Sequence, residues 1–357
     1  MWAFKILSWF GIGQKTNQSR AMDLIFVSVM LLTYFDTLFL YFLAVKINGY
    51  ELKWALERIL SVTCSILLML SINRNRHEFA AAIRKAKFIT NTKSEKKLNV
   101  LAGCILASPF IYSLVLLLAC EIGKDELGFH YFFYGIPVKN KILKYFILYC
   151  KSFLYYFLFP TYSNFVVLIF CASCHTSKMF IRNLCEELER CPAKAFTTSI
   201  QIRCLNCRRK IYKMLDILQE SFYFISFVAC AGNFSYCFAL LTQLMLYSFS
   251  ESALTYQADT VINSINVTVP LFMMFWIPEE IQMELEKLNK IILWKYEMRA
   301  SSGMVSENPS IEKLLLEEKP FVISGCSLIA FQRCHILSVF GTALTYGLLI
   351  LSFEVRN

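Results

Sequence analysis

Charged residues, glycine and proline are all scarce in this sequence. Only 17% of the residues are Asp, Glu, Lys or Arg, whereas about 25% are charged in ordinary soluble domains. The 357 residues include 12 Gly and 8 Pro, and turn residues do not recur at short intervals. Without closely spaced turns or alternating strands, a barrel of the outer-membrane type is a poor interpretation. Long helices are the expected structure.

Histidine is rarer still, and the chain lacks a catalytic pattern. No second acid, base or nucleophile pattern converges with the four histidines, His77, His130, His175 and His335. The net charge is +10, but the basic residues lie between apolar runs, and no zinc-finger, helix-turn-helix or RNA-binding signature is present. We therefore expect no enzyme, no cofactor and no nucleic-acid partner.

Long apolar runs are what this sequence has in abundance. Apolar residues make up 57% of the chain, and a window of about 19 residues detects helices that cross a bilayer. The sequence thus predicts an all-α polytopic membrane protein with seven transmembrane helices, forming a single domain over residues 1–357. The seven runs are residues 22–45, 54–72, 99–120, 145–170, 220–248, 259–277 and 334–353.

The distribution of Lys and Arg predicts the orientation of these spans. One alternating set of connections, including the N-terminal segment, holds 27 Lys and Arg, and the other set holds 7. By the positive-inside rule the N-terminus is cytoplasmic and the C-terminus extracellular, in the plasma membrane. This orientation opposes that of a G-protein-coupled receptor. The first half, residues 1–170, then holds spans one to four, and 171–357 holds cytoplasmic helices and spans five to seven.

Two ionisable residues fall inside predicted spans, where a charge persists only if it faces a cavity or a partner. They are Asp36 in the first span and Lys151 in the fourth. A ligand role and a mutual or headgroup pairing are both open. Cys120 and Cys150 bracket the second outside loop and are candidates for a disulfide.

Two cysteine patterns resemble metal or haem sites. Residues 171–175 read CASCH, the order used for covalent haem, and Cys204 and Cys207 follow at a zinc-like spacing. The predicted topology places this region inside the cell, whereas covalent haem attachment needs an oxidising compartment. We therefore interpret these cysteines as small buried residues and expect no metal site.

Polar and aromatic residues gather in the outer halves of the spans, which is typical of a half-buried pocket and also of interfacial aromatic belts. The candidate ligand pocket therefore combines side chains from spans three to six. Its members are Tyr112, Tyr155, Tyr156, Gln243, Tyr247, Gln257 and Asn263.

The end of the chain carries a family resemblance. Residues 345–353, TYGLLILSF, resemble the carboxyl-terminal signature of insect gustatory receptors, which is Thr-Tyr, five hydrophobic residues and Gln-Phe. Thr345, Tyr346 and Phe353 match this signature, and Ser352 stands where the family usually has Gln. The predicted span count, orientation and short tail agree with the family over nearly the whole chain.

This resemblance implies a tetrameric, ligand-gated cation channel, either homomeric or assembled with other gustatory receptor subunits, that binds a small tastant. It implies a pore lined by the last helix, with Thr345, Tyr346, Leu349, Ser352 and Phe353 as the lining and gate residues. An insect odorant receptor of the same architecture and a polytopic solute transporter are the alternatives. The sequence does not distinguish a sugar, a bitter compound or carbon dioxide as the ligand.

The residues beyond the gate add one expectation. Glu354, Arg356 and the terminal carboxylate of Asn357 sum to −1 in each subunit. In a fourfold assembly this charge would form an acidic ring that concentrates cations at the outer mouth of the pore. Glu354 is therefore the predicted pore-mouth residue.

Overall fold

A computed structural model describes most of the chain. The described residues are 17–48, 52–75, 92–123, 132–134, 136, 138–246, 253–304, 308–317 and 320–354. Within them, all-α architecture is confirmed, because helices account for every element except one short β-hairpin. The long helices are α2 (Asn17–Asn48), α3 (Leu52–Arg74), α5 (Thr92–Gly123), α7 (Lys141–Tyr156), α8 (Tyr162–Arg190), α9 (Thr198–Leu246), α10 (Leu254–Ser301) and α12 (Cys334–Glu354).

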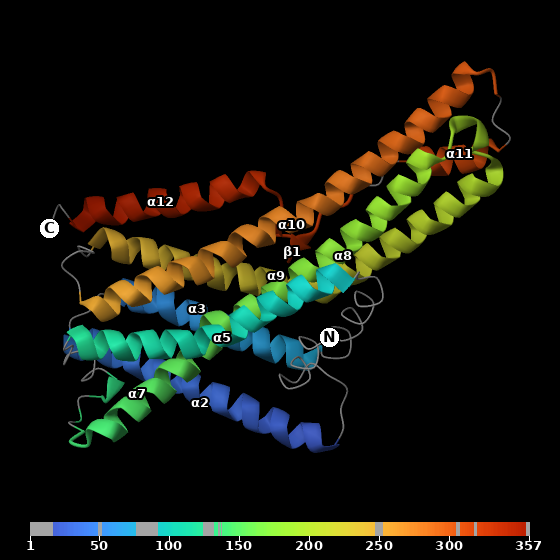
Figure 1. The fold of residues 1–357 in the computed structure, drawn as a ribbon. Helices are drawn as coiled ribbons and strands as arrows, with labels where there is room; N and C mark the ends of the chain where they lie inside the picture. The colour runs from blue at the N-terminus through green and yellow to red at the C-terminus, as the bar shows by residue number, and fades with distance from the viewer. Residues whose placement is uncertain are drawn as a thin grey trace.

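These helices coincide with the seven predicted spans. Six helical segments are long and apolar enough to cross a membrane, with α7 and α8 together forming the fourth. The seventh, α12, has 21 residues, which corresponds to ~30 Å of helix and therefore to the hydrocarbon core of a bilayer. In Figure 1 the carboxyl ends of α2, α5, α9 and α12 gather at the left end of the molecule, as alternating crossings require.

The fourth span contains a break that the hydropathy pattern did not predict. Between α7 and α8 the helix is kinked at Phe157–Thr161, where Phe159 has non-helical backbone angles of φ −148° and ψ 131°. Pro160 follows in the same turn. Proline lacks a backbone N–H and crowds the preceding turn of a helix, so the sequence contains the cause of this break.

The core lies where α8, α9 and α10 pack against one another and against α3. The α3–α9 contact is unusually close, because a Cβ atom added at Gly232 would lie 2.9 Å from the Cβ of Cys64. Any larger residue at Gly232 would therefore push the two helices apart. This close contact holds α3 directly against α9.

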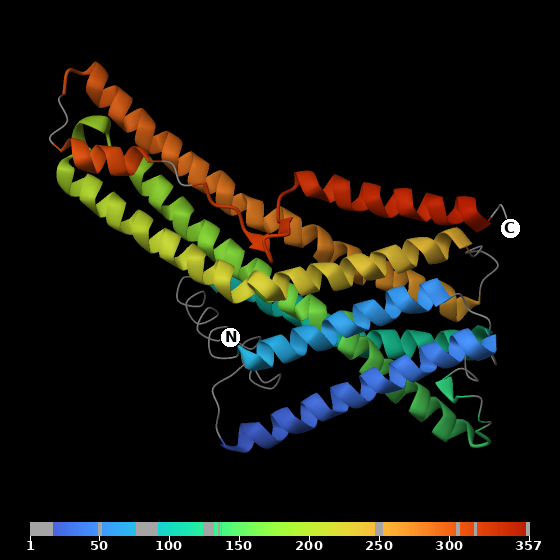
Figure 2. The same ribbon diagram turned by 180° about the vertical axis from the view of Figure 1, so that it is seen from behind.

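Three helices continue well beyond their predicted spans. The distal parts of α8, α9 and α10 extend together away from the other helices, with α11 (Pro309–Leu316) beside them (Figure 2). Buried basic side chains join this extension to the turns at its end: Arg299 Nη1 donates to the Phe196 carbonyl at 2.6 Å, and Lys295 donates to the Cys191 carbonyl. Each buried cation thus caps carbonyl groups that no helix satisfies.

A short hairpin connects this extension to α12. Its strands β1 (Ser324–Gly325) and β2 (Ile329–Ala330) pair antiparallel, with Ser324 opposite Ala330. The hairpin is held on α9, since the Gln219 amide donates to the Ser324 carbonyl at 2.7 Å and accepts from its N–H at 3.0 Å. A Cβ at Gly325 would lie 3.0 Å from the Phe227 backbone. The start of α12 is therefore fixed by its preceding loop.

Candidate ligand site and pore helix

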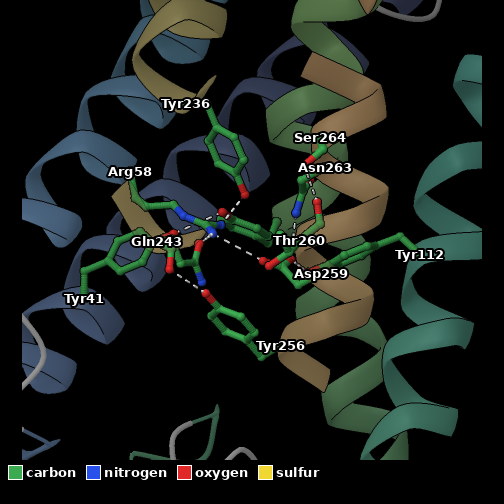
Figure 3. A network of polar contacts seen from close by, with 11 residues as sticks. Tyr41, Arg58, Tyr112, Tyr236, Gln243, Tyr256, Asp259, Thr260, Asn263 and Ser264 are labelled. Atoms are coloured by element: carbon green, nitrogen blue, oxygen red, sulfur yellow. Dashed lines mark hydrogen bonds and ion pairs between the residues drawn. The ribbon is translucent and has the colours of Figure 1, made fainter. Parts of the chain in front are cut away.

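A buried arginine on α3 organises polar side chains from two other helices (Figure 3). Arg58 is 3% exposed, and its guanidinium lies over the Tyr236 ring with 4.4 Å between Cζ and the ring centroid. It also donates to the Tyr236 hydroxyl, and Nη2 donates to Gln243 Oε1 at 2.7 Å. A buried guanidinium requires such acceptors, because its solvation by water is lost.

The counter-charge comes from α10. Asp259 Oδ2 lies 3.3 Å from Arg58 Nη2, and the aspartate is only partly exposed. The other oxygen, Oδ1, accepts hydrogen bonds from the Tyr112 hydroxyl at 2.6 Å and from Asn263 Nδ2 at 2.7 Å. Both oxygens are therefore used, as is usual for a carboxylate removed from water. This single carboxylate links α3, α5 and α10.

Aromatic side chains surround this ion pair. The rings of Tyr112 and Tyr156 stack with centroids 4.0 Å apart, and the hydroxyls of Tyr41 and Tyr155 lie 3.0 Å apart. The Tyr256 hydroxyl donates to the Gln243 backbone carbonyl at 3.0 Å. Stacked tyrosines provide flat apolar faces next to polar groups. We call the group Arg58, Tyr112, Tyr236, Gln243, Asp259 and Asn263 the polar cluster.

Two oxygen atoms of α10 at this level have no hydrogen-bond partner among the described residues. They are Asn263 Oδ1 and Thr260 Oγ1, on side chains that are 0% and 2% exposed. A buried acceptor without a partner is unfavourable by about 1–3 kcal/mol. A donor from water or from a bound molecule would remove this cost, so both atoms are suited to contact a ligand.

The structure brings most of the predicted pocket residues together. Tyr112, Gln243 and Asn263 belong to the polar cluster, and Tyr156 stacks directly on it. Tyr155 reaches Tyr41, which lies beside Arg58 in Figure 3. Gln257 is half-buried on α10, and Tyr247 lies outside the described residues.

Sequence reasoning missed Arg58 and Asp259, the two charges at the centre. Each lies near the outer end of an apolar run, where a charge is ordinarily expected to face water and lipid headgroups. The signal that was present is their opposite sign at similar depth in two spans, at residue 58 of the span 54–72 and at residue 259 of the span 259–277. Two such charges in apolar helices favour mutual pairing.

Among the described side chains of α12, the pore helix predicted by the resemblance, none is fully buried. The described contacts of α12 are with α9 and, less extensively, with α10. Leu337 is 80% exposed and Tyr346 57% exposed, although the Tyr346 ring meets Phe238 of α9 edge-on at 6.4 Å. The Thr345 hydroxyl donates to the Gly341 carbonyl of its own helix at 2.8 Å.

The side chains at the outer end of α12 lie outside the described set. Leu349, Ser352, Phe353 and Glu354 belong to the helix, whose last residue is Glu354, but only their backbone is described. Their predicted roles as pore, gate and mouth residues therefore stay predictions.

The comparison with solved structures establishes which known fold this chain shares. The chain is similar to the insect olfactory receptor OR5 from Machilis hrabei in complex with eugenol, with a TM-score of 0.68, 15% identity, and coverage of 99% of this chain and 98% of that one. A second structure of OR5 gives 0.59, 14%, 98% and 97%. The chain has the insect olfactory receptor fold.

The similarity extends over nearly the full length of both chains, so it includes the α8–α10 extension and α12 as well as the spans. A scan against protein-family models finds no match, and a search of curated proteins finds none either. At 15% identity the likeness concerns the fold alone. The chain is thus a multi-pass membrane protein with the fold of an insect olfactory receptor.

The two predicted intramembrane charges, Asp36 and Lys151, pair with each other. Lys151 Nζ lies 3.2 Å from Asp36 Oδ1 and donates to the Tyr134 hydroxyl at 2.6 Å. The same hydroxyl donates to Asp36, and Lys151 also donates to the Phe132 carbonyl at 3.1 Å. Of the alternatives left open by the sequence, mutual pairing is the one the structure shows. It joins α2 to α7.

The structure shows no disulfide between Cys120, which is buried, and Cys150, which is half-buried. Cys171 donates weakly to the Met273 carbonyl at 3.7 Å, and Cys174 and Cys204 are buried. Among the described residues, no group of three or more metal-ligating side chains is found. Cys171, Cys174 and Cys204 are thus buried, as the sequence indicated, whereas Cys207 is half-buried.

Proposed function

We propose that this protein is a subunit of a ligand-gated, non-selective cation channel that acts as a gustatory chemoreceptor in the plasma membrane. The observation that carries this proposal is α12: a bilayer-length apolar helix, packed mainly on α9, in a chain with the insect olfactory receptor fold. The Thr345–Tyr346 and Phe353 match favours the gustatory branch. In this proposal α12 lines the pore.

The exposure of α12 supports a multi-subunit pore. Leu337, Leu344 and Tyr346 are 80%, 48% and 57% exposed in a single chain. Exposed leucine is compatible with contact to lipid. Thr342 and Thr345 are exposed as well, and each hydroxyl donates a hydrogen bond to a carbonyl of its own helix. A helix with both apolar and hydroxyl-bearing exposed faces suits a wall between protein and ions. Four copies arranged around a common axis would form that wall.

The polar cluster supports a ligand site that faces outward. It lies on the ends of α3, α5, α9 and α10 that gather with the carboxyl end of α12 (Figure 1). Under the predicted orientation that end is extracellular. A small tastant that bonds to Asn263 or Thr260 and rests on the Tyr112–Tyr156 stack would contact three helices at once, so its binding would favour one arrangement of them.

An odorant receptor of the same architecture is the second candidate. It is favoured by the similarity to OR5, whose structure is described as a complex with eugenol. The two candidates share the proposed channel and site, and differ only in the ligand that opens it.

Topology and current recordings test the proposal together. Epitope tags at the two ends should show a C-terminal tag accessible on intact cells and an N-terminal tag accessible only after permeabilisation. Purified protein in planar bilayers should then show unitary cation currents, with eugenol, sucrose and quinine as probes. Tags on the same side of the membrane would overturn the seven-span topology and the channel proposal that depends on it. Saturable solute uptake without unitary currents would overturn the channel and support a transporter.

A further inference from the structure

A second group of charges lies at the base of α12. Arg333, the residue before the helix, is 29% exposed at its side chain and contacts two acids of α10. Its Nε lies 3.6 Å from Glu279 Oε2, and its Nη2 lies 3.5 Å from Glu280 Oε1. Its backbone N–H also donates to Glu279 Oε2 at 2.6 Å. The pore helix therefore starts at an ionic contact with α10.

Further contacts make this junction specific for arginine. The Arg333 guanidinium lies over the Trp276 ring, with 3.9 Å from Cζ to the centroid. Glu280 Oε2 accepts from Lys178 of α8 at 3.0 Å, which extends the junction to a third helix. Only a planar guanidinium stacks on an indole while facing two carboxylates, so lysine would not reproduce the arrangement. With two acids and two bases, Arg333, Glu279, Glu280 and Lys178 are neutral as a group.

The segment just before Arg333 is tightly packed. Phe331 is 1% exposed, and its ring centroid lies 5.6 Å from those of Phe170 on α8 and Phe275 on α10. The hairpin preceding it is bound to α9 through Gln219 and Ser324. Beyond Arg333 the exposed side chains of α12 begin. Arg333 is thus the boundary between a fixed base and a loosely packed helix.

One helix connects this boundary to the polar cluster. Asp259 and Glu279 are both on α10 and 20 residues apart, which corresponds to ~30 Å along the helix. Two prolines interrupt the backbone hydrogen bonds of α10: Pro270 lies between Asp259 and Glu279, and Pro278 directly precedes Glu279. The carbonyl that Pro270 leaves free, that of Asn266, accepts from Asn164 Nδ2 at 2.6 Å. Prolines are where helices bend, so α10 has a defined position for changing its direction.

We propose that Arg333 is a positioning residue for gating: it holds the base of the pore helix to Glu279 and Glu280, so that a tilt of α10 at the ligand site tilts α12. This inference rests on the proposed channel function and specifies how the site and pore are coupled. Rigid packing below Arg333 and sparse packing above it convert a movement of α10 into a rotation of α12 about its base. The pore wall itself is unchanged by the contact.

The test is single-channel recording of full-length protein in planar bilayers. Arg333→Gln removes the ion pairs, and Arg333→Lys keeps the charge but not the stacking. Arg182→Gln is the matched control, because Arg182 pairs with Glu186 at 3.1 Å within α8 and is 50% exposed. Open probability is measured without ligand and with eugenol, sucrose and quinine, beside unitary conductance and surface abundance.

We expect Arg333→Gln to change the open probability by about tenfold, the size of a typical coupling between sites, with unitary conductance unchanged. Arg333→Lys should fall between Arg333→Gln and the wild type, and Arg182→Gln should match the wild type. If Arg333→Gln does not reach the membrane, Arg333→Lys provides the comparison. The exchange Arg333→Glu with Glu279→Arg restores an ion pair at this position and should bring the open probability back toward the wild type.

The outcomes separate this inference from the proposed function. If the wild type gives unitary currents and the open probability is unaltered in Arg333→Gln, or in Arg333→Lys where Arg333→Gln does not reach the membrane, the role of Arg333 is overturned and the channel stays intact. Wild-type protein without unitary currents in any probe would overturn the channel proposal, and this inference with it. A change in unitary conductance would place Arg333 in the pore wall and contradict a positioning role.

Discussion

Arg58 of α3 and Asp259 of α10, 201 positions apart in the sequence, form an ion pair with 3.3 Å between Nη2 and Oδ2. Gln243 and Tyr236 complete the arginine side, and Tyr112 and Asn263 complete the aspartate side. Helices from both halves of the chain are thereby tied together at the level of the candidate ligand site.

Removing one partner of this pair should lower the thermal stability more than removing both. Asp259→Asn leaves a buried guanidinium without counter-charge, a loss of about 3–5 kcal/mol for a buried pair. Arg58→Met together with Asp259→Asn leaves no net charge, so we expect its melting temperature in detergent to exceed that of either single variant. Thermal unfolding followed by size-exclusion chromatography measures this. Losses that simply add in the double variant would show that the two charges are independent.

The hydroxyl of Tyr112 should matter more than that of Tyr155. Tyr112 donates to a carboxylate at 2.6 Å, whereas Tyr155 and Tyr41 share a bond between neutral hydroxyls at 3.0 Å. A hydrogen bond to a charged group contributes about 1.5–3 kcal/mol and a neutral one about 0.5–1.5 kcal/mol. Tyr112→Phe should therefore lower thermal stability and shift the ligand concentration dependence more than Tyr155→Phe. Equal effects of the two substitutions would show that the hydrogen bond from Tyr112 to Asp259 has no special weight.

The spans could be predicted because hydropathy averaged over ~19 residues depends only on local sequence. The pairing of Arg58 with Asp259 could not, since it depends on how α3, α9 and α10 pack, including the close approach at Gly232. Tyr112, Tyr155 and Tyr156 were predicted from their depth in the spans, whereas Tyr236, which contacts Arg58, was not. On α10, Tyr256, Asp259 and Asn263 recur at helical spacing and share one face, while Gln257 lies about 100° from Tyr256 around the helix.

The second ion pair should affect stability but not ligand response. Lys151 lies 3.2 Å from Asp36 and joins α2 to α7, with Tyr134 bonded to both side chains. Lys151→Met should lower surface abundance, because Asp36 then lacks its counter-charge in an apolar environment. Adding Asp36→Asn should restore part of that abundance. If the double variant reaches normal abundance but its ligand concentration dependence is shifted, Asp36 and Lys151 contact the ligand after all.

The proposed gate can be tested by changing side-chain size at the end of α12. Rings of Phe353 would close the pore by excluding water rather than by any chemical bond. Phe353→Ala should therefore raise the ligand-independent current, and Ser352→Gln, which introduces the residue usual in gustatory receptors, should narrow the pore and lower unitary conductance. Phe353→Leu is the control, since it keeps an apolar side chain. Unchanged basal current in Phe353→Ala would place the gate elsewhere on the helix.

The proposed pore mouth can be tested by changing the salt concentration. Glu354 is the last residue of α12, and four copies around a pore would attract cations by long-range electrostatics. Glu354→Gln should therefore lower inward cation conductance at ~0.01 M salt, where charges act over ~30 Å, and have little effect at ~1 M, where they are screened within ~3 Å. Glu354→Asp retains the charge and should behave as the wild type at both concentrations. Because the ring acts on ion supply and not on helix position, open probability should stay constant throughout. Equal conductance at low salt would show that Glu354 lies away from the ion path, and a loss that persists at high salt would assign it to the pore wall instead of the mouth.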